Sequence, residues 1–377
     1  MKPRIQTIDA LRGLVMIIMA LDHIRDFFHY DAFMHDPLNI QESSPLLFMT
    51  RWITHFCAPA FIFLTGLSAY LYGLKHTRNE LSRFLFTRGL WLVLLELTLF
   101  AFGWFTKIDL AHPMLMVIWA IGISMVFLAL ASRLPYTVIL IMGILIVCLH
   151  NAGDHIQFEA GTIQDILWRF LHVHGPVHIS GNFGPLILYP ILPYLGLICI
   201  GFAFGKLYAP ETKPEQRKKA LLGAGLACTG IFILLRFTNL YGDPAHWETQ
   251  DSPFSTVLSF INCTKYPVSL LFALMILGPS ILFLYFMEGS NTIFNTFLVT
   301  IGKVPMFYYI LHLYLIRLLA TILEKGNPRS MMNAEGQYHL WTVYLIWAGV
   351  VLALYLPCKW YGEYKSAHPE QKWLSYL

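Results

Sequence analysis

Long apolar runs separated by short polar stretches dominate the pattern of this chain. Many of these runs reach about 20 residues, the length that an α-helix needs to cross the hydrocarbon core of a bilayer. A further stretch, 289–302, is shorter and mixed in polarity, so we expect a surface helix or a re-entrant segment there. The pattern predicts an all-α polytopic membrane protein, a single domain over 1–377, with about ten transmembrane helices at residues 11–30, 47–74, 86–106, 113–132, 135–151, 184–208, 219–241, 266–287, 304–323 and 340–358.

The composition agrees with this pattern. Of the 377 residues, 56% are hydrophobic and 13% are charged, and the mean hydropathy is +0.57. An average soluble domain has about 25% charged residues, so we expect an integral multi-pass protein whose surroundings are the lipid bilayer. Nothing in the chain suggests a nucleic acid partner. The six cysteines are scattered without the spacing of a zinc site or a disulfide framework, so we expect no metal.

The lysines and arginines predict the orientation, because cytosolic segments carry an excess of both. With the N-terminus inside, the cytosolic basic residues are Lys2, Arg4, Lys75, Arg78, Arg83, Arg88, Arg133, Lys206, Lys213, Arg217, Lys218, Lys219, Lys303, Lys359, Lys365 and Lys372. The outer segments are longer and carry fewer, namely Arg25, Arg51, Lys107, Arg169, Arg236, Lys265, Lys325 and Arg329. We therefore predict that both termini are cytosolic, in agreement with an even number of spans.

Three long polar loops then face the outside, at 31–46, 152–183 and 242–265. Long loops without secondary structure of their own are often binding elements or lids. The third loop is rich in turn-forming residues and carries Trp247, which offers a stacking surface for a substrate. The alternative is that these loops only close the outer mouth of the protein.

The first span carries ionisable side chains, although such groups are costly in hydrocarbon and usually face a cavity or a partner. Arg12 and His23 are eleven positions apart, so on a helix both side chains share one face and lie ~16 Å apart along the axis. This spacing predicts a fixed cation near one membrane surface and a titratable imidazole in the far half of the same wall. The alternative is a snorkelling arginine and an interfacial histidine.

Acidic residues near His23 make it a candidate general base, because a neighbouring carboxylate holds an imidazole ready to accept a proton at neutral pH. Asp26 lies three residues on and is the better partner within the helix, whereas Asp22 points about 100° away. An orienting carboxylate from another span is equally compatible. At the start of the span, Asp9 and Arg12 have the spacing of an ion pair, and Arg12 is a candidate phosphate ligand.

The second predicted span opens with Arg51 and His55, an i, i+4 pair on one helix face. Both lie at the outer end of the span, level with His23, and a short loop makes the first two spans neighbours. We interpret Arg51 as a substrate-binding residue and His55 as a second catalytic candidate. Alternatively, Arg51 anchors at the headgroups and His55 hydrogen-bonds a carbonyl group.

Three further polar residues in or beside the later spans are candidates for substrate binding. Lys265 precedes the eighth span, and Arg236 lies near the outer end of the seventh. Either residue could hold an anionic or hydroxylated substrate, or serve as an interfacial anchor. His312 lies about mid-membrane, where a lone polar side chain often forms a hydrogen bond between helices instead.

Motifs of soluble enzymes do not explain this chain, which has no Gly-rich phosphate loop, no Gly-x-Ser-x-Gly elbow and no HExxH. Instead, Asp9-Ala-Leu-Arg12-Gly followed after ten residues by His23 resembles the first-span Arg-x10-His signature of the membrane acyltransferase-3 family. The run from Ile8 to His23 is similar to the bacterial DUF1624 proteins and to the catalytic domain of heparan-α-glucosaminide N-acetyltransferase. This resemblance covers nearly the whole chain and continues through Ala58–Gly66, Leu188–Gly196, Tyr241–Pro244 and Asn262–Pro267.

The resemblance implies acyl transfer across the membrane, from acetyl-CoA bound on the cytosolic side to a sugar hydroxyl or amine outside. The matching positions tie Arg12 to the donor and His23 to catalysis. In the heparan acetyltransferase, however, the important histidine lies in the outer loop between the first two spans, and the position of His23 holds no histidine. Here that loop offers His29 and His35, so the catalytic assignment is divided between His23, His55 and, with less support, His35.

We therefore expect an acetyl-CoA-dependent O- or N-acetyltransferase acting on a carbohydrate-like acceptor at the outer face of a bacterial cytoplasmic membrane. A homodimer is compatible with the sequence. His23 acts as a general base or as an acetyl carrier, so direct transfer and a ping-pong route both stay open. The alternative function is a transporter of a polar solute, in which the intramembrane Arg and His line a pathway. The lack of a detectable inverted repeat argues against it.

Overall fold

The computed structural model describes residues 5–30, 32, 34–179, 181, 183–323 and 338–376. Lys2, Arg4, Lys325 and Arg329, which contributed to the orientation prediction, lie outside the described residues. The chain divides into two compact helical units. Unit 1 comprises Met1–Cys57, Phe102–Lys107 and Phe283–Leu377, and unit 2 comprises Ala58–Ala101 and Ile108–Leu282.

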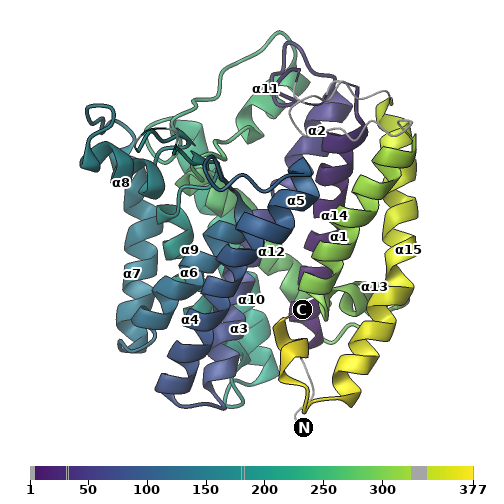
Figure 1. Cartoon of the computed structure of the whole chain (residues 1–377). Coiled ribbons are helices and arrows are strands. Elements are labelled where there is room, and N and C mark those ends of the chain that lie inside the picture. Colours follow the sequence, from purple (N-terminus) through teal and green to yellow (C-terminus); the bar gives the residue numbers. More distant parts are fainter. Residues whose placement is uncertain are drawn as a thin grey trace. The chain divides into compact units, whose positions relative to one another are not determined.

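Unit 1 is built around the first helix, α1, against which α13, α14 and α15 pack (Figure 1). Two polar contacts of α15 support this packing: the Trp347 indole N–H donates to the Ile17 carbonyl at 2.8 Å, and the hydroxyls of Tyr344 and Thr50 lie 2.6 Å apart. The helices of this unit are α1 Gln6–Phe28, α2 Pro45–Thr54, α5 Ala101–Phe105, α13 Ile293–Gly302, α14 Pro305–Leu323, α15 Leu340–Ala367 and the 3-10 helix η4 Lys372–Tyr376.

The contact between α1 and α13 is closer than side chains would allow. A Cβ added at Gly13 would overlap the carbonyl of Leu298, and one added at Gly302 would overlap the carbonyl of Asp9. Small residues permit such backbone approach between membrane helices. The stretch expected to be a surface or re-entrant segment is thus a ten-residue helix that packs on α1, with Leu298 and Val299 buried against Ala10.

The second predicted span, 47–74, is broken into α2 and α3 (Cys57–Gly73). Proline inside a helix removes a hydrogen-bond donor, and its ring clashes with the carbonyl four residues earlier. Pro59 therefore disfavours a regular helix at His55, and the amides of His55 and Phe56 instead bond three residues back, to the carbonyls of Trp52 and Ile53. The predicted span thus consists of two helices, and the Ser44 hydroxyl caps α2 by accepting from the Leu47 amide.

Unit 2 contains most of the remaining helices, and its packing again uses small residues. Gly89 of α4 and Gly122 of α6 face each other so closely that a Cβ on either would meet the other's carbonyl oxygen. The elements are α3, α4 Arg78–Leu95, the π-helical turn η1 Glu96–Phe100, α6 Val117–Ala131, α7 Tyr136–Leu149, η2 His150–Gly153, α8 Ile163–Leu171, α9 Leu192–Phe204, η3 Gly205–Tyr208, α10 Pro214–Thr238, α11 Pro253–Ile261 and α12 Leu270–Met287, whose last turn belongs to unit 1.

A small sheet in unit 2 joins segments far apart in sequence. Its strands are β1 Met114–Leu115, β2 Gly175–Pro176 and β3 Leu186–Ile187, in the order β1-β3-β2. Strand β3 pairs parallel with β1, with Met114 opposite Leu186, and antiparallel with β2. Leu115, Val177 and Ile187 form a buried cluster beneath it, which Ile166 and Phe170 of α8 cover. Two-residue strands leave no periodic signal, so the sequence did not predict them.

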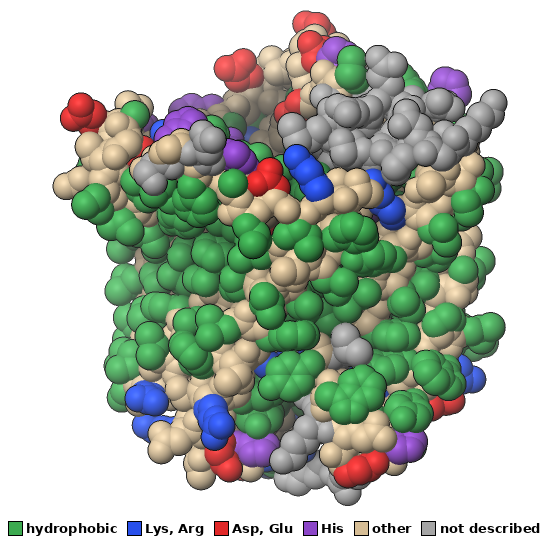
Figure 2. Space-filling view, viewed as in Figure 1, with side chains coloured by type: hydrophobic (Ala, Val, Ile, Leu, Met, Phe, Trp, Pro, Cys, Tyr) green, Lys and Arg blue, Asp and Glu red, His purple; other side chains and the backbone are tan. Residues whose placement is uncertain are grey.

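The helical membrane-protein class is confirmed. Within the described residues, seven helical stretches are long and apolar enough to cross a membrane: Pro45–Gly73, Arg78–Phe105, Tyr136–Gly153, Pro214–Thr238, Leu270–Met287, Pro305–Leu323 and Leu340–Ala367. The other predicted spans are also helices, but α6 and α9 with η3 are shorter, and α1 carries five charged residues. Hydrophobic side chains cover the region of α4, α6 and α7, while charged side chains gather beyond the ends of these helices (Figure 2). The orientation of the chain stays a prediction.

Candidate functional site

The most distinctive polar contact in unit 1 joins two buried histidines from α1 and α14. The Nδ1 atom of His23 lies 2.8 Å from the Nε2 atom of His312, and the two rings stack with centroids 5.0 Å apart. His23 is 9% exposed and His312 is fully buried. The helix–helix hydrogen bond that we weighed for His312 is therefore present, and its partner is the histidine that the sequence singled out as a candidate base.

The hydrogen bonds of His312 determine where the protons of the pair lie. Its Nδ1 atom is 3.0 Å from the carbonyl oxygen of Tyr308, which can only accept, so Nδ1 carries the proton. The Nε2 atom of a neutral His312 is then an acceptor, and His23 donates to it from Nδ1. This arrangement leaves the lone pair of a neutral His23 on Nε2, the nitrogen that a general base or nucleophile uses.

Aromatic side chains of the same unit hold the His23 ring. Trp104 of α5 meets it edge-on with centroids 4.7 Å apart, and Tyr309 of α14 does so at 6.0 Å. Trp104 is itself held, because its ring stacks on Phe27 at 5.3 Å and its carbonyl accepts from Arg317 at 2.8 Å. The imidazole of His23 therefore has little freedom to rotate.

Charged residues next to His23 are paired with one another. Both carboxylate oxygens of Asp22 lie 2.6 Å from one Arg51 nitrogen, and one of them also accepts from Thr54 at 3.0 Å. Arg25 donates to Asp22 and to Asp26. Two cations and two anions thus compensate each other at the C-terminal end of α1. The bonds from Arg51 and Thr54 to Asp22 fasten α2 to α1. The catalytic roles of Asp22 and Asp26 and substrate binding by Arg51 stay predictions.

At the N-terminal end of α1, the ion pair expected between Asp9 and Arg12 is present at 2.6 Å. Arg12 also donates to the carbonyl of Gly302 at 3.2 Å. A cation at the C-terminus of a helix is favourable because the last carbonyls are unpaired and carry partial negative charge. Arg12 therefore caps α13, and its predicted role toward a donor phosphate stays a prediction.

His55 occupies the C-cap position of α2 and is 1% exposed. It lies at the break before Pro59, one turn beyond Arg51, as the i, i+4 spacing requires. His35, the remaining catalytic candidate, is exposed and lies 3.6 Å from Glu42 in the loop between α1 and α2. Neither position tests the roles predicted for these histidines.

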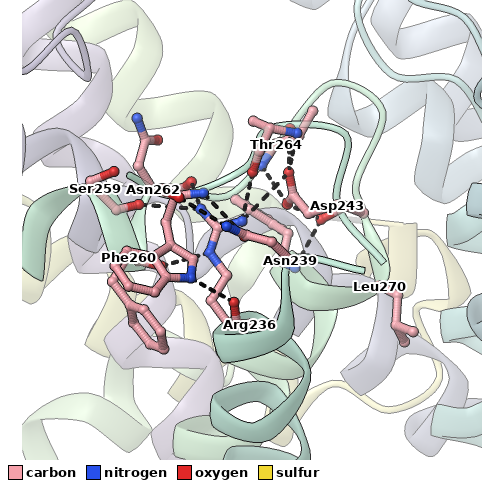
Figure 3. Close-up of polar contacts among 12 residues, drawn as sticks. Arg236, Asn239, Asp243, Ser259, Phe260, Asn262, Thr264 and Leu270 are labelled. Atoms are coloured by element: carbon pink, nitrogen blue, oxygen red, sulfur yellow. Dashed lines mark hydrogen bonds and ion pairs between the residues drawn. The ribbon is translucent and has the colours of Figure 1, made fainter. Parts of the chain in front are cut away.

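In unit 2, Arg236 is 1% exposed and its guanidinium binds main-chain carbonyls (Figure 3). It donates to Phe260 at 2.8 Å, Ala245 at 2.6 Å, Ser259 at 3.2 Å and Asn262 at 2.7 Å. Trp247 packs into the same cluster and donates its indole N–H to the carbonyl of Arg236. These bonds fold the loop between α10 and α11 onto the end of α10. Both side chains donate to main-chain carbonyl groups of the protein itself. Substrate binding by Arg236 and Trp247 stays a prediction.

Lys265, the last of the predicted binding residues, follows α11 in unit 2 and is 8% exposed. Its ammonium lies over the ring of Tyr266, 5.1 Å from the centroid.

Among the described residues, no three His, Cys, Asp or Glu side chains come together as they would around a metal ion. The expectation that the protein needs no metal is not tested by that observation.

A second buried histidine, His172, contacts a carboxylate in unit 2, and the sequence did not single out this pair. His172, the C-cap of α8, contacts Asp154 through Nε2 at 2.7 Å, and Asn151 donates to the other carboxylate oxygen at 2.9 Å. Burial raises the pKa of Asp154, but the hydrogen bonds from His172 and Asn151 together lower it by more than burial raises it. The pKa of Asp154 therefore lies below the ordinary value. Asn151 in turn accepts from the amide of Leu270 at the start of α12.

Other residues that contact His23 and His312 were also not predicted from the sequence. Trp104 lies inside a predicted span, but nothing in its neighbourhood distinguishes it from the other aromatic residues there. The pairing of His23 with His312 had one signal, namely that both are histidines within predicted spans.

Comparison with known protein families gives one match. The family model described as heparan-alpha-glucosaminide N-acetyltransferase, catalytic, matches residues 4–236. This range contains α1 with His23, and also His55, whereas α14 with His312 lies beyond it. No curated protein matches the chain.

Proposed function

Because the chain belongs to the heparan-alpha-glucosaminide N-acetyltransferase catalytic family, which uses acetyl-CoA, we propose that it transfers an acetyl group from cytosolic acetyl-CoA to a carbohydrate-like acceptor across a bacterial cytoplasmic membrane. Family membership implies a membrane acetyltransferase. The nature of the acceptor, a hydroxyl or an amine of a sugar, and the route of transfer are the parts that we propose.

The contact between His23 and His312 carries this proposal. With the protons placed as the Tyr308 carbonyl requires, His23 presents Nε2 as the basic atom. In direct transfer, Nε2 removes the proton from the acceptor hydroxyl or amine as it attacks the thioester carbonyl, and the thiolate of CoA leaves. The His23 imidazolium formed in this step keeps its Nδ1 hydrogen bond to His312. In a ping-pong route, Nε2 itself attacks the thioester and carries the acetyl group to the acceptor.

The remaining predicted residues take supporting roles in this proposal. Arg12, with Asp9, lies on the donor side, ~16 Å along α1 from His23, a separation that suits a long ligand with phosphates at one end and a thioester at the other. Asp22, Asp26 and Arg51 position the outer end of α1 through their ion pairs. His55 is the second catalytic candidate, because it is buried within the same unit.

The test is turnover of labelled acetyl-CoA by the full chain in detergent, with a mixture of neutral and amino sugars as acceptors. We expect release of CoA and labelled sugar from the wild type, loss of both in His23→Ala, and retention in His112→Ala. His112 is a matched control, since its side chain is 57% exposed and it belongs to unit 2. Loss in His55→Ala with retention in His23→Ala would move the catalytic role to His55.

A second measurement distinguishes the two routes. Acid quenching after incubation with labelled acetyl-CoA and no acceptor leaves label on the protein only in the ping-pong route. Absence of CoA release under every condition, together with absence of thermal stabilisation by CoA, would overturn the proposal and favour the transporter.

A further inference from the structure

The indole N–H of Trp104 is a buried donor without an acceptor. Trp104 is 2% exposed, and its Nε1 atom makes no hydrogen bond within the part of the chain that the structure describes. A buried donor loses its hydrogen bond to water on folding, and most buried polar groups of proteins regain a partner. The fold therefore gains nothing from this N–H group, and its presence calls for another explanation.

The ring that carries this N–H group lies against the imidazole of His23. The two ring centroids are 4.7 Å apart, the ring planes are inclined by 77°, and both residues belong to unit 1. An acceptor atom that is hydrogen-bonded to Nε2 of His23 lies about 3 Å from that nitrogen, and the carbonyl group that it attacks is its next neighbour. The Trp104 indole is thus close enough to reach the oxygen of that carbonyl.

Contacts of the side chain and of the main chain fix the Trp104 ring. It stacks on Phe27 with centroids 5.3 Å apart, and the Trp104 carbonyl accepts from Arg317 at 2.8 Å. The preceding residue, Gly103, lies so close to α14 that an added Cβ would fall 2.7 Å from a methyl carbon of Leu313. The donor is therefore held in place before any substrate arrives, as the electrostatic stabilisation of a transition state requires.

We infer that Trp104 is a catalytic residue of the acetyl transfer, whose indole N–H stabilises the oxyanion that forms from the acetyl carbonyl. This inference rests on the proposed function. An indole N–H only donates, so it can neither remove a proton nor attack the thioester. The role that it can take beside a general base is to stabilise negative charge, and an unpaired, fixed and buried donor is suited to that role.

The step balances as follows in direct transfer. As the acceptor oxygen or nitrogen attacks the carbonyl carbon, the π electrons of the C=O bond move to its oxygen, and the acceptor proton moves to Nε2 of His23. When the tetrahedral intermediate collapses, the C=O bond forms again, the C–S bond breaks, and CoA leaves as the thiolate. The Trp104 N–H donates most strongly while the oxygen carries the negative charge, so it lowers the barrier. In the ping-pong route, the same donor serves both transfers.

The first test is steady-state kinetics of the full chain in detergent, with labelled acetyl-CoA and the mixture of sugars. Trp104→Phe keeps an aromatic ring but lacks the N–H group, so we expect kcat to fall by about 10²–10³-fold with little change in KM for acetyl-CoA. The matched control is Trp119→Phe in unit 2, because the Nε1 atom of Trp119 is likewise buried without a hydrogen bond among the described residues. We expect this control to keep kcat within about threefold.

A second variant separates the hydrogen bond from the packing of the ring. With 3-benzothienylalanine in place of Trp104, the shape of the indole is retained and a sulfur atom replaces the N–H group. We expect kcat to fall as in Trp104→Phe, whereas the pH dependence of kcat stays that of the wild type because the ring still holds His23. If Trp104→Phe does not fold, this variant decides the question. A wild-type kcat with 3-benzothienylalanine would overturn the inference.

Infrared difference spectroscopy provides a readout without turnover. Acetyl-CoA with a heavy carbon isotope at its acetyl carbonyl is bound to His23→Ala and to His23→Ala combined with Trp104→Phe. Because a hydrogen bond weakens the C=O bond, we expect the carbonyl stretch at a higher wavenumber in the double variant, and an equal stretch in both would overturn the inference. Inactivity of the wild type would overturn the proposed function together with this inference. An active wild type whose kcat neither change at Trp104 lowers would overturn this inference alone.

Discussion

Each unit buries a histidine that contacts an ionisable side chain, and the chemical type of that side chain differs between the units. In unit 1, His23 contacts a second histidine, His312, at 2.8 Å, and in unit 2, His172 contacts the carboxylate of Asp154 at 2.7 Å. The first pair is neutral when one proton sits on each ring, so a proton gained on Nε2 of His23 brings a new charge into the site. The second pair contains the carboxylate of Asp154, which accepts a hydrogen bond from Nε2 of His172. The comparison teaches that the neutral pair suits proton transfer and that the charged pair suits fastening one segment to another.

The largest expected difference between the pairs is in rate. We expect His23→Ala to lower kcat for acetyl transfer by about 10²–10⁴-fold, the contribution typical of a positioned general base. His172→Ala leaves kcat within about threefold, since its partner Asp154 ties η2 to α8 and, through Asn151, to α12. Steady-state kinetics with both variants measures the difference, and equal losses would remove the distinction.

The next effect concerns His312 as a positioning residue. His312→Leu leaves Nδ1–H of His23 without its acceptor, and we expect kcat to fall by about 10–100-fold with little change in KM for acetyl-CoA. His312→Gln restores an acceptor oxygen near the position of Nε2 and recovers part of the rate. A merely structural residue would not show this rescue, so equal rates for Leu and Gln would refute the assigned role.

Asp154→Asn should act on stability rather than on rate. The substitution weakens a charge-assisted hydrogen bond to buried His172, which costs about 1–3 kcal/mol of unfolding free energy. The matched control is Asp165→Asn, because Asp165 pairs with the more exposed Arg169 and such surface pairs contribute about 0–1 kcal/mol. Thermal or denaturant unfolding of both variants gives the comparison, and similar losses would contradict it.

The smallest effect is the pH dependence of that stability. Since the folded pKa of Asp154 lies below its ordinary value of 3.8, its contribution is present in full above that value and is lost as the pH falls through the lowered folded pKa. The difference in melting temperature between wild type and Asp154→Asn therefore shrinks below about pH 4. Melting curves from pH 3 to pH 7 test this, and a difference that grows toward acid would have the wrong sign.

The fold was predictable where the signal is local. Apolar runs located the helices, and the 3.6-residue period put Arg12 and His23 on one helix, because both features depend only on neighbouring residues. The signal for the break between α2 and α3 was also local, namely Pro59. The span prediction missed this break because it was based on the hydropathy of the whole run. The strands β1 to β3 are two residues long, and Met114 of β1 pairs with Leu186 of β3, 72 residues further along the chain, so no local window of sequence contains the cause of that pairing.

The site was predictable only in part, because its contacts are long-range. His23 stood out, but its partner lies 289 residues further along the chain, and a pattern read from one sequence does not pair such positions. Arg236 and Lys265 looked equivalent as basic residues near span ends. The structure separates them, since carbonyl groups surround the guanidinium of Arg236 and no carboxylate of the described residues pairs with Lys265. That difference depends on how the main chain folds around each cation.

The backbone contact between Gly13 and Gly302 makes the N-terminal end of α1 a fulcrum, a fixed point about which the helix can tilt. His23 lies ten residues further along the helix, about 15 Å from this point. A tilt of α1 by about 5° about the fulcrum swings the imidazole by about 1.3 Å, and a misplacement of about 1 Å can cost about a hundredfold in rate. A single methyl group added at Gly13 or Gly302 has no room, because it would overlap a carbonyl of the facing helix. The position of the His23 imidazole thus depends on a contact between two residues that carry no side chain, almost three helical turns away from it along α1.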